Sequence, residues 1–265
     1  MRLLCLLHLA TILPTISAHG RITNVTTSNG TVYTGWDPEL AQKANPSPIV
    51  AWRASNLGNI FVKPSQFNTS DITCHYNATP GALHVATVPG DTLKLQWNEW
   101  PSSHKGPVLT YVAACGESCA TVDKESLRWS KIDHMGWLNS SGISELGGTW
   151  ASDVLRENGA ARYVKVPQKL KEGHYVLRHE IIALHVADQL DGAQAYPQCI
   201  NLEVGRADGE GMGEDLNQGV RGEGLYGWRD SGVLVDIHNG VTGYNIPGPS
   251  LWEFAEKATQ PGEKR

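Results

Sequence analysis

The chain has 265 residues and a formal net charge of −5 at pH 7, from 22 lysines and arginines and 27 aspartates and glutamates. No basic run interrupts this mild acidity, which argues against nucleic acid and anionic membranes as partners. The 28 glycines and 14 prolines indicate many turns rather than long helices, and the length suits one large all-β domain or two small ones.

The first 18 residues have the layout of a secretory signal peptide. Arg2 gives a charged start, residues 3–13 an apolar run, and residues 15–18 a small-residue exit. Cleavage after Ala18 would leave His19 as the first residue of the mature protein. We therefore expect a secreted, extracellular protein.

A histidine at the mature N-terminus has an unusual capacity to bind metal. His19 would offer two nitrogens, its imidazole and its α-amine, and an amine with a pKa near ~7.7 can exchange its proton for a metal at neutral pH. With a second histidine close by, three nitrogens could form a flat T around copper, which favours such ligands in tetragonal geometry. The alternative is that His19 is merely the residue at which the signal peptidase stops.

Strand patterns dominate the mature chain. Alternating or continuously apolar runs bounded by glycine and proline predict strands at residues 92–97, 108–114, 162–166, 174–186 and 199–204. Short strands separated by such turns are typical of a β-sandwich. We expect long loops at 26–48, 117–149 and 205–230, and a short helix at 153–157.

Four cysteines remain once Cys5 leaves with the signal peptide, and they permit three pairings. Cys115 and Cys119 are four residues apart, so a local loop closure between them would leave Cys74 to join Cys199. A four-cysteine zinc site is the alternative. Its spacing is not a two-knuckle pattern and the compartment is oxidising, which favours disulfides.

Glycosylation sequons fit the same secreted surface. They begin at Asn24, Asn29, Asn68, Asn77 and Asn139. Because such triplets are common by chance, we expect only some of them to be used.

Two histidine patterns are candidates for the second metal ligand. His104 lies in a turn flanked by proline and glycine before an apolar strand, which would present it at one end of a sandwich; the alternative is an ordinary loop histidine. His179 and His185 are six residues apart, so we reject a zinc-protease helix. With a period of two they would share one strand face, or simply be polar residues at the ends of a buried strand.

Gln194 and Tyr196 also alternate onto one face of an extended segment. A phenol oxygen below a plane of three nitrogens would be a weak axial ligand for copper. The alternative is a buried tyrosine whose hydroxyl is hydrogen-bonded, which is common.

The motifs occur together in one order. They are the His19-Gly20 start, the segment 100–108 around His104, and the segments 178–185, 192–199 and 244–249. This combination resembles a fungal lytic polysaccharide monooxygenase of auxiliary-activity family nine, and the resemblance covers nearly the whole mature chain. It implies an immunoglobulin- or fibronectin-III-like β-sandwich with long loops and a flat face carrying one copper ion.

The resemblance also implies roles for individual residues. His19 would supply its amine and ring nitrogen, His104 the third nitrogen, and Tyr196 the axial position, while His185 and Gln194 would position an oxygen species. Tyr244 would stack on a sugar ring of the substrate. The family's disulfides would be Cys74–Cys199 and Cys115–Cys119.

The implied activity is oxidative cleavage of β-1,4-glucan, chiefly cellulose, with an external electron donor and O2 or H2O2. The implied organisation is a signal peptide at 1–18 and one catalytic domain at 19–265, ending in a short polar tail with no appended cellulose-binding module. We expect a monomer that binds neither nucleic acid nor membrane. Two alternatives remain: a non-catalytic copper-binding protein that uses the same histidines, and a carbohydrate-binding module without chemistry.

Overall fold

The computed structural model describes residues 20–39, 46–56, 60–140, 146–206, 213–216 and 218–261. Strands dominate this part of the chain, and the elements are β1 (Ile22–Thr26), β2 (Val32–Thr34), α1 (Asp71–Cys74), β3 (Val85–Thr87), β4 (Thr92–Trp97), β5 (Val108–Gly116), β6 (Ser130–Met135), β7 (Trp137–Asn139), β8 (Thr149–Trp150), α2 (Ala151–Glu157), β9 (Ala161–Lys165), β10 (Gly173–Ala183), β11 (Gln194–Ala195) and β12 (Gln198–Val204). No helix among the described residues is long and apolar enough to cross a bilayer.

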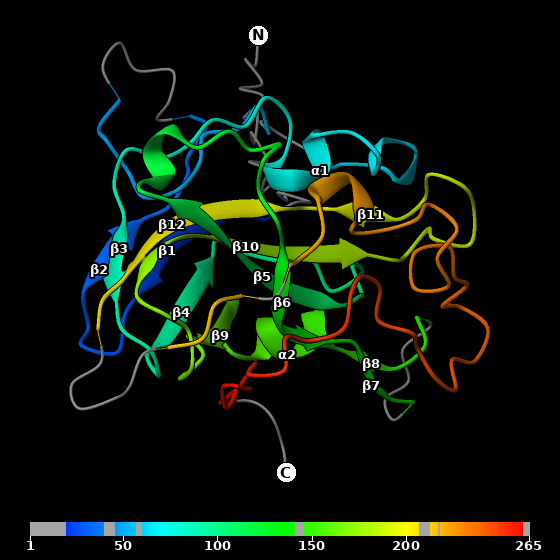
Figure 1. Ribbon diagram of the computed structural model, residues 1–265. Helices are drawn as coiled ribbons and strands as arrows, with labels where there is room; N and C mark the ends of the chain where they lie inside the picture. The colour runs from blue at the N-terminus through cyan, green and yellow to red at the C-terminus, as the bar shows by residue number, and fades with distance from the viewer. Residues whose placement is uncertain are drawn as a thin grey trace, which may run out of the picture.

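The strands form two principal sheets that face each other. The smaller sheet has the order β2-β1-β4-β9 and is antiparallel throughout. The larger has the order β3-β12-β10-β5-β6, with β11 paired to the end of β10 and only β3 running parallel to its neighbour. In Figure 1 strands of the larger sheet cross the upper half of the molecule, while β4 and β9 lie below. The predicted β-sandwich is confirmed.

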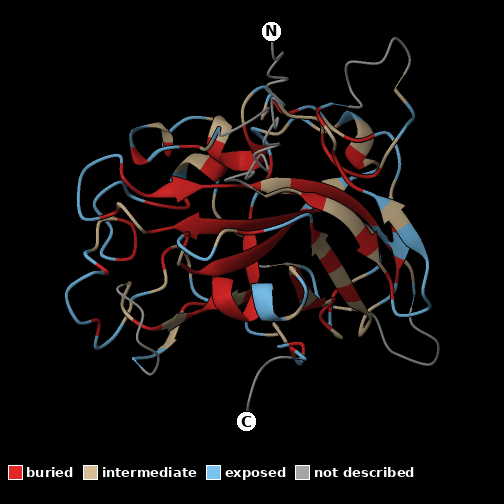
Figure 2. Ribbon diagram, turned by 180° about the vertical axis from the view of Figure 1, so that it is seen from behind, coloured by how far each residue is buried: buried red, intermediate tan, exposed pale blue. Residues whose placement is uncertain are grey.

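The two sheets are buried to different degrees. β4 alternates between half-buried and buried residues, which is typical of a strand with one face in the core. In β10 every residue from Tyr175 onward is buried, because the larger sheet packs against the smaller one on one face and against loops on the other. Figure 2 shows this contrast between the central strands, in the buried colour, and the paler edge strand β2.

The prediction of a single loop at 117–149 was wrong, because this segment contains β6 and β7. β6 pairs with β5 and closes one edge of the larger sheet. Its sequence lacks an apolar pattern since several of its buried side chains are polar and have partners from distant segments. Asp133 accepts hydrogen bonds from Arg162, and Lys131 donates to the carbonyl oxygen of Pro247 at 2.7 Å.

Other boundaries differ modestly from the expectations. The strand expected at 174–186 ends at Ala183, so His185 lies beyond it in a turn and does not share a strand face with His179. The loop expected at 26–48 contains the three-residue strand β2. The short helix is present as α2 and begins two residues earlier than predicted.

Both expected disulfides are present. Cys74 joins Cys199 across a sequence separation of 125 residues, with a Cα–Cα distance of 5.4 Å. Cys115 joins Cys119 at the end of β5, with a Cα–Cα distance of 5.1 Å. The first bridge ties α1 to β12, which places the segment around α1 over the outer face of the larger sheet.

Candidate active site

The turn between β4 and β5 holds His104 at one end of the sandwich. Trp100 folds back over this turn, and its indole nitrogen donates to the carbonyl oxygen of His104 at 2.8 Å. The backbone N–H of Leu184 donates to the carbonyl oxygen of Lys105 at 2.8 Å, which fastens the turn to the chain just after β10. At Gly106 a Cβ atom would lie 1.9 Å from the carbonyl oxygen of Ile182, so only glycine permits this close approach.

This attachment brings two candidate histidines together. The rings of His104 and His185 stack with centroids 4.1 Å apart and an interplanar angle of 29°. His104 is 9% exposed, and Ser103 places its hydroxyl 3.1 Å from Nδ1 of the His104 ring. The backbone oxygen of His185 accepts a hydrogen bond from Nε2 of His238 at 2.9 Å. The His104 ring is therefore held by its neighbour in the turn and by the His185 ring, while the backbone of His185 is held by a residue from a separate loop.

Gln194 and Tyr196 form the second part of the site. The Tyr196 hydroxyl donates to Oε1 of Gln194 at 2.7 Å, as their expected common face allows. Tyr196 is 3% exposed, and burial raises the pKa of its phenol above the ordinary value. Because the phenol stays protonated at neutral pH, it donates to the amide oxygen and leaves the amide NH2 group of Gln194 as a donor toward other oxygens.

The Trp100 ring links both halves of the site. It packs edge-to-face on His104 at 5.8 Å and on Tyr196 at 5.1 Å between centroids. The same ring borders the start of the described chain, because a Cβ atom on Gly20 would lie 3.2 Å from it and 2.2 Å from the carbonyl oxygen of Glu99. Trp100 belongs to one of the sequence motifs, but no role was predicted for it.

The segment that follows Gly20 is fixed by two long-range hydrogen bonds. The backbone N–H of Arg21 donates to Oδ1 of Asn98 at 2.7 Å, and the backbone N–H of Ile22 donates to Oε1 of Gln198 at 2.7 Å. The chain therefore arrives beside the Trp100 ring in a defined position. His19, the residue expected to be the central metal ligand, lies outside the described residues.

Tyr244 has other contacts than the site residues described above, which are His104, His185, Gln194 and Tyr196. Its ring packs edge-to-face on Trp150 with centroids 4.9 Å apart, and its hydroxyl donates to the carbonyl oxygen of Gly232 at 2.6 Å. The residue is half-buried. Its role as a sugar platform stays a prediction.

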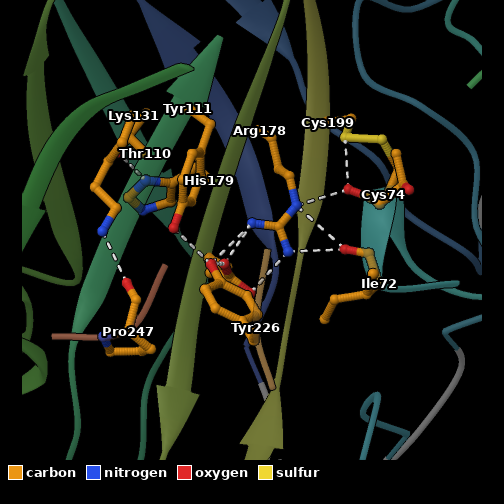
Figure 3. A network of polar contacts seen from close by, with 12 residues as sticks. Ile72, Cys74, Thr110, Tyr111, Lys131, Arg178, His179, Cys199, Tyr226 and Pro247 are labelled. Carbon is orange, nitrogen blue, oxygen red and sulfur yellow. Dashed lines mark hydrogen bonds and ion pairs between the residues drawn. A yellow bond between two sulfur atoms is a disulfide. The ribbon is translucent and has the colours of Figure 1, made fainter. Parts of the chain in front are cut away.

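A buried polar network holds the loops on the outer face of the larger sheet (Figure 3). Arg178 and Glu180, two residues apart on β10, form a fully buried ion pair. Arg178 also donates to the carbonyl oxygen of Ile72 at 2.7 Å, and the hydroxyl of Tyr226 donates to Glu180 and lies 2.8 Å from that of Tyr111. This network was not predicted from the sequence, since nothing in the spacing of single charges indicates their partners.

The site contains side chains that can bind a metal ion, but the described residues do not supply enough ligands for one. There, no three histidine, cysteine, aspartate or glutamate side chains converge on one point. His104 supplies one imidazole and Tyr196 a neutral phenol. A site for a divalent ion therefore needs further nitrogen donors, and the chain adjacent to Gly20 is the segment that enters beside the same ring.

Comparisons with known proteins agree on one family. The family profile described as Auxiliary Activity family 9 (formerly GH61) matches residues 19–244. Lytic polysaccharide monooxygenase H of this family, from Thermothelomyces thermophilus, is 45% identical over 89% of the chain, and lytic polysaccharide monooxygenase A from Talaromyces verruculosus is 43% identical over 91%. The chain spans 66% and 71% of the lengths of these two relatives.

A solved structure shares the fold closely. The extended catalytic domain of LPMO9A from H. jecorina superposes with a TM-score of 0.85 and 41% sequence identity. The match covers 93% of the chain and 96% of the solved domain. The likeness therefore extends over both sheets and the loops that carry the site.

Proposed function

The chain belongs to Auxiliary Activity family 9, the lytic polysaccharide monooxygenases, and from this premise we propose that it is a secreted, copper-dependent oxidoreductase that cleaves cellulose or a related β-1,4-glucan. The observation that carries the proposal is the convergence of His104, His185, Gln194 and Tyr196 near the Trp100 ring, where the chain enters at Gly20.

The copper ligands would come from three residues. His19 is bonded directly to Gly20, a residue that packs against the Trp100 ring. Once the signal peptide is removed after Ala18, His19 would bind through its free α-amine and its imidazole. Because Ser103 lies against Nδ1 of the His104 ring, His104 would bind through Nε2, and Tyr196 would contribute its phenol oxygen.

A bound copper ion would supply one-electron redox chemistry with an external reductant and O2 or H2O2. The surrounding residues orient the reactants. Protonated Tyr196 holds the Gln194 amide so that its NH2 group can donate to an oxygen species, and His185 stacks on His104 to fix the angle of that ring. Such partners of metal ligands set ligand orientation. A site at the end of a sandwich suits an insoluble substrate, which cannot enter a cleft.

The first test is mass spectrometry of products released from amorphous cellulose by the processed protein with copper and ascorbate. We expect oxidised oligosaccharides only in the complete reaction, and none without copper or reductant.

A variant with one glycine added before His19 should lose tight copper binding, since its histidine no longer carries the terminal amine. His104→Ala should lose product formation while keeping the fold.

His174→Ala is the matched control, because it removes a histidine near the opposite end of β10. Copper affinity and oxidation at wild-type levels in the glycine-extended variant would reject the proposed ligand set. Tight copper binding by the native protein without oxidised product from any glucan would indicate a non-catalytic copper-binding protein. Binding of cellulose that is independent of copper, again without product, would indicate a carbohydrate-binding module.

A further inference from the structure

A hollow of about 420 Å³ opens beside the loop that connects His185 to Gln194. Three segments line it, within residues 64–68, 190–191 and 226–228. Its size falls in the range of small-ligand sites. None of the residues proposed to bind copper or oxygen lines it, so it is distinct from the site described above.

One wall of the hollow is an exposed indole. Trp228 is 43% exposed and is the only exposed residue among the nine tryptophans, all of which the structure describes. The guanidinium of Arg229 lies 4.1 Å from the Trp228 ring centroid and covers one face of the ring. Leu190, 59% exposed, adds apolar surface nearby. A flat apolar ring at the rim of a hollow suits the apolar face of a sugar.

The remaining lining combines apolar side chains, among them Pro64 and Phe67, with polar groups that are held in place. The backbone N–H of Ser65 donates to Oδ1 of Asp191 at 2.7 Å, and Lys63 lies 3.9 Å from the same carboxylate. Tyr226 belongs to the buried network of Arg178 and Glu180 (Figure 3). The hollow is therefore pre-formed, and it combines hydrogen-bonding groups with an aromatic surface.

The lining also contains a sequon. Asn68, followed by Thr69 and Ser70, is exposed and lies in the wall of the hollow. The four other sequon asparagines are also described, and none of them lines this hollow. We propose that Asn68 carries an N-linked glycan whose first N-acetylglucosamine occupies the hollow and packs against Trp228. The proposal rests on the proposed secretion and is independent of the copper chemistry.

The modification would follow the ordinary secretory reaction. Nδ2 of Asn68 forms a bond to C1 of the terminal N-acetylglucosamine of a lipid-pyrophosphate-linked oligosaccharide. The bond from C1 to the pyrophosphate oxygen breaks, the lipid pyrophosphate leaves, and the amide loses one proton. Because the first sugar is attached directly to a wall residue, it is tethered beside Trp228 and bridges the segment of Asn68 to the loops at 190–191 and 226–228.

The test uses the full chain secreted from a fungal host, and it begins with mass spectrometry of the Asn68 glycopeptide. Acrylamide quenching then reports on Trp228, with Trp228→Phe as the baseline for the other tryptophans. We expect Trp228 to be shielded in the glycosylated protein. It should stay shielded after an endoglycosidase trims the glycan to one N-acetylglucosamine. In Ser70→Ala, which keeps Asn68 but removes its sequon, quenching should rise and the emission should shift to longer wavelength.

Thr79→Val, which removes the sequon of Asn77, is the matched control and should leave Trp228 shielded. Unmodified Asn68 in the secreted protein, or equal quenching of Trp228 with and without the glycan, would overturn the proposal. If soluble cellopentaose protects Trp228 in a protein whose Asn68 is unmodified, the occupant of the hollow is a free saccharide and the glycan proposal is overturned. Cellulose oxidation is measured on every form, so failure of the glycan proposal is distinguishable from failure of the proposed activity.

Discussion

At the scale of single residues, Tyr196 shows how one hydrogen bond orients a neighbouring side chain. Its hydroxyl is almost fully buried, and burial raises the pKa of a phenol that is already protonated at neutral pH, so it acts as a donor. That proton selects the oxygen of Gln194 as its acceptor. The orientation of the Gln194 amide is therefore a consequence of this hydrogen bond from the protonated phenol.

Tyr196→Phe removes this donor with little change in shape. We expect product formation to fall by about 10-fold or more, because the variant loses a proposed copper ligand and also the donor that orients the Gln194 amide, and loss of such an orienting partner alone costs about 10-fold or more. Unfolding midpoints should change little. Product yield from amorphous cellulose, with copper affinity measured in parallel, checks the expectation. Tyr175→Phe is the control, since Tyr175 donates to the carbonyl oxygen of Lys171 away from the site; equal losses in both variants would contradict a specific role for Tyr196.

His179 should make stability depend on pH. It is fully buried in β10, and burial, with Arg162 and Arg178 nearby, lowers its pKa to about 3. The unfolded chain binds a proton at this residue near pH 6.5 whereas the folded chain does not. The contribution of His179 to the free energy of unfolding is therefore fully present above pH 6.5 and is lost as the pH falls toward 3. We expect this residue alone to lower the free energy of unfolding by about 2 kcal/mol from pH 7 to pH 5.

Urea unfolding at the two pH values checks this effect. The comparison variant is His179→Asn, whose amide can keep a contact with Thr110 in place of the imidazole Nδ1. The variant should lose less stability between pH 7 and pH 5 than the wild type, because it lacks the contribution of His179. It should still lose some, because burial lowers the pKa values of His75 and His134 to about 4 in both proteins. An identical loss in both proteins would remove His179 as a cause.

At the scale of elements, β4 and β6 show which strands can be predicted from sequence. The alternation in β4 follows from one buried and one half-buried face, so its boundaries were predicted correctly. β6 buries Asp133 and Lys131, whose partners Arg162 and Pro247 lie far along the chain. A local pattern cannot contain that information, and β6 was therefore predicted as loop.

The pair of Asp133 and Arg162 offers a direct test of this account. Both side chains are almost fully buried, with 2.6 Å between Nη2 and Oδ2. Asp133→Ala leaves the guanidinium without its carboxylate, and we expect it to cost about 3–5 kcal/mol of unfolding free energy. The double variant Asp133→Leu, Arg162→Met should recover part of this loss.

The matched control is the exposed pair of Lys171 and Asp215, which lie 3.1 Å apart. Asp215→Ala should change the unfolding free energy by about 1 kcal/mol or less, as for other surface pairs. Urea unfolding at one pH compares all the variants. Similar losses of unfolding free energy in Asp133→Ala and Asp215→Ala would show that burial does not determine how much the pair of Asp133 and Arg162 contributes to stability.

At the scale of the molecule, the site forms where segments far apart in sequence reach one end of the sandwich. The motifs predicted the residue types and the common face of Gln194 and Tyr196. The predicted strand boundaries did not give the position of His185. It contacts His104 from a turn after β10 and does not share a strand face with His179. The position of Trp100 between His104 and Tyr196 depends on sheet order, which spacing does not reveal.

The two disulfides should stabilise the whole fold unequally. Cys74–Cys199 closes a separation of 125 residues and Cys115–Cys119 one of four. In the chain-entropy account, removing the long bridge costs about 5 kcal/mol and removing the short one about 2 kcal/mol. Paired cysteine-to-serine variants, compared by urea unfolding under non-reducing conditions, check the difference. A larger loss from the short bridge would contradict an origin in chain entropy.

The long bridge also sets an order of events during biosynthesis. At about 5–20 residues per second, Cys74 leaves the ribosome about 6–25 seconds before Cys199, whereas Cys115 and Cys119 emerge within about a second of each other. In an oxidising compartment, the cysteines that Cys74 would meet first are Cys115 and Cys119, which are not its partner in the folded protein. Early closure of Cys115 onto Cys119 removes both of them and leaves Cys74 with Cys199 alone. We therefore expect the small bridge, which contributes least to stability, to limit mispairing of Cys74 before Cys199 emerges.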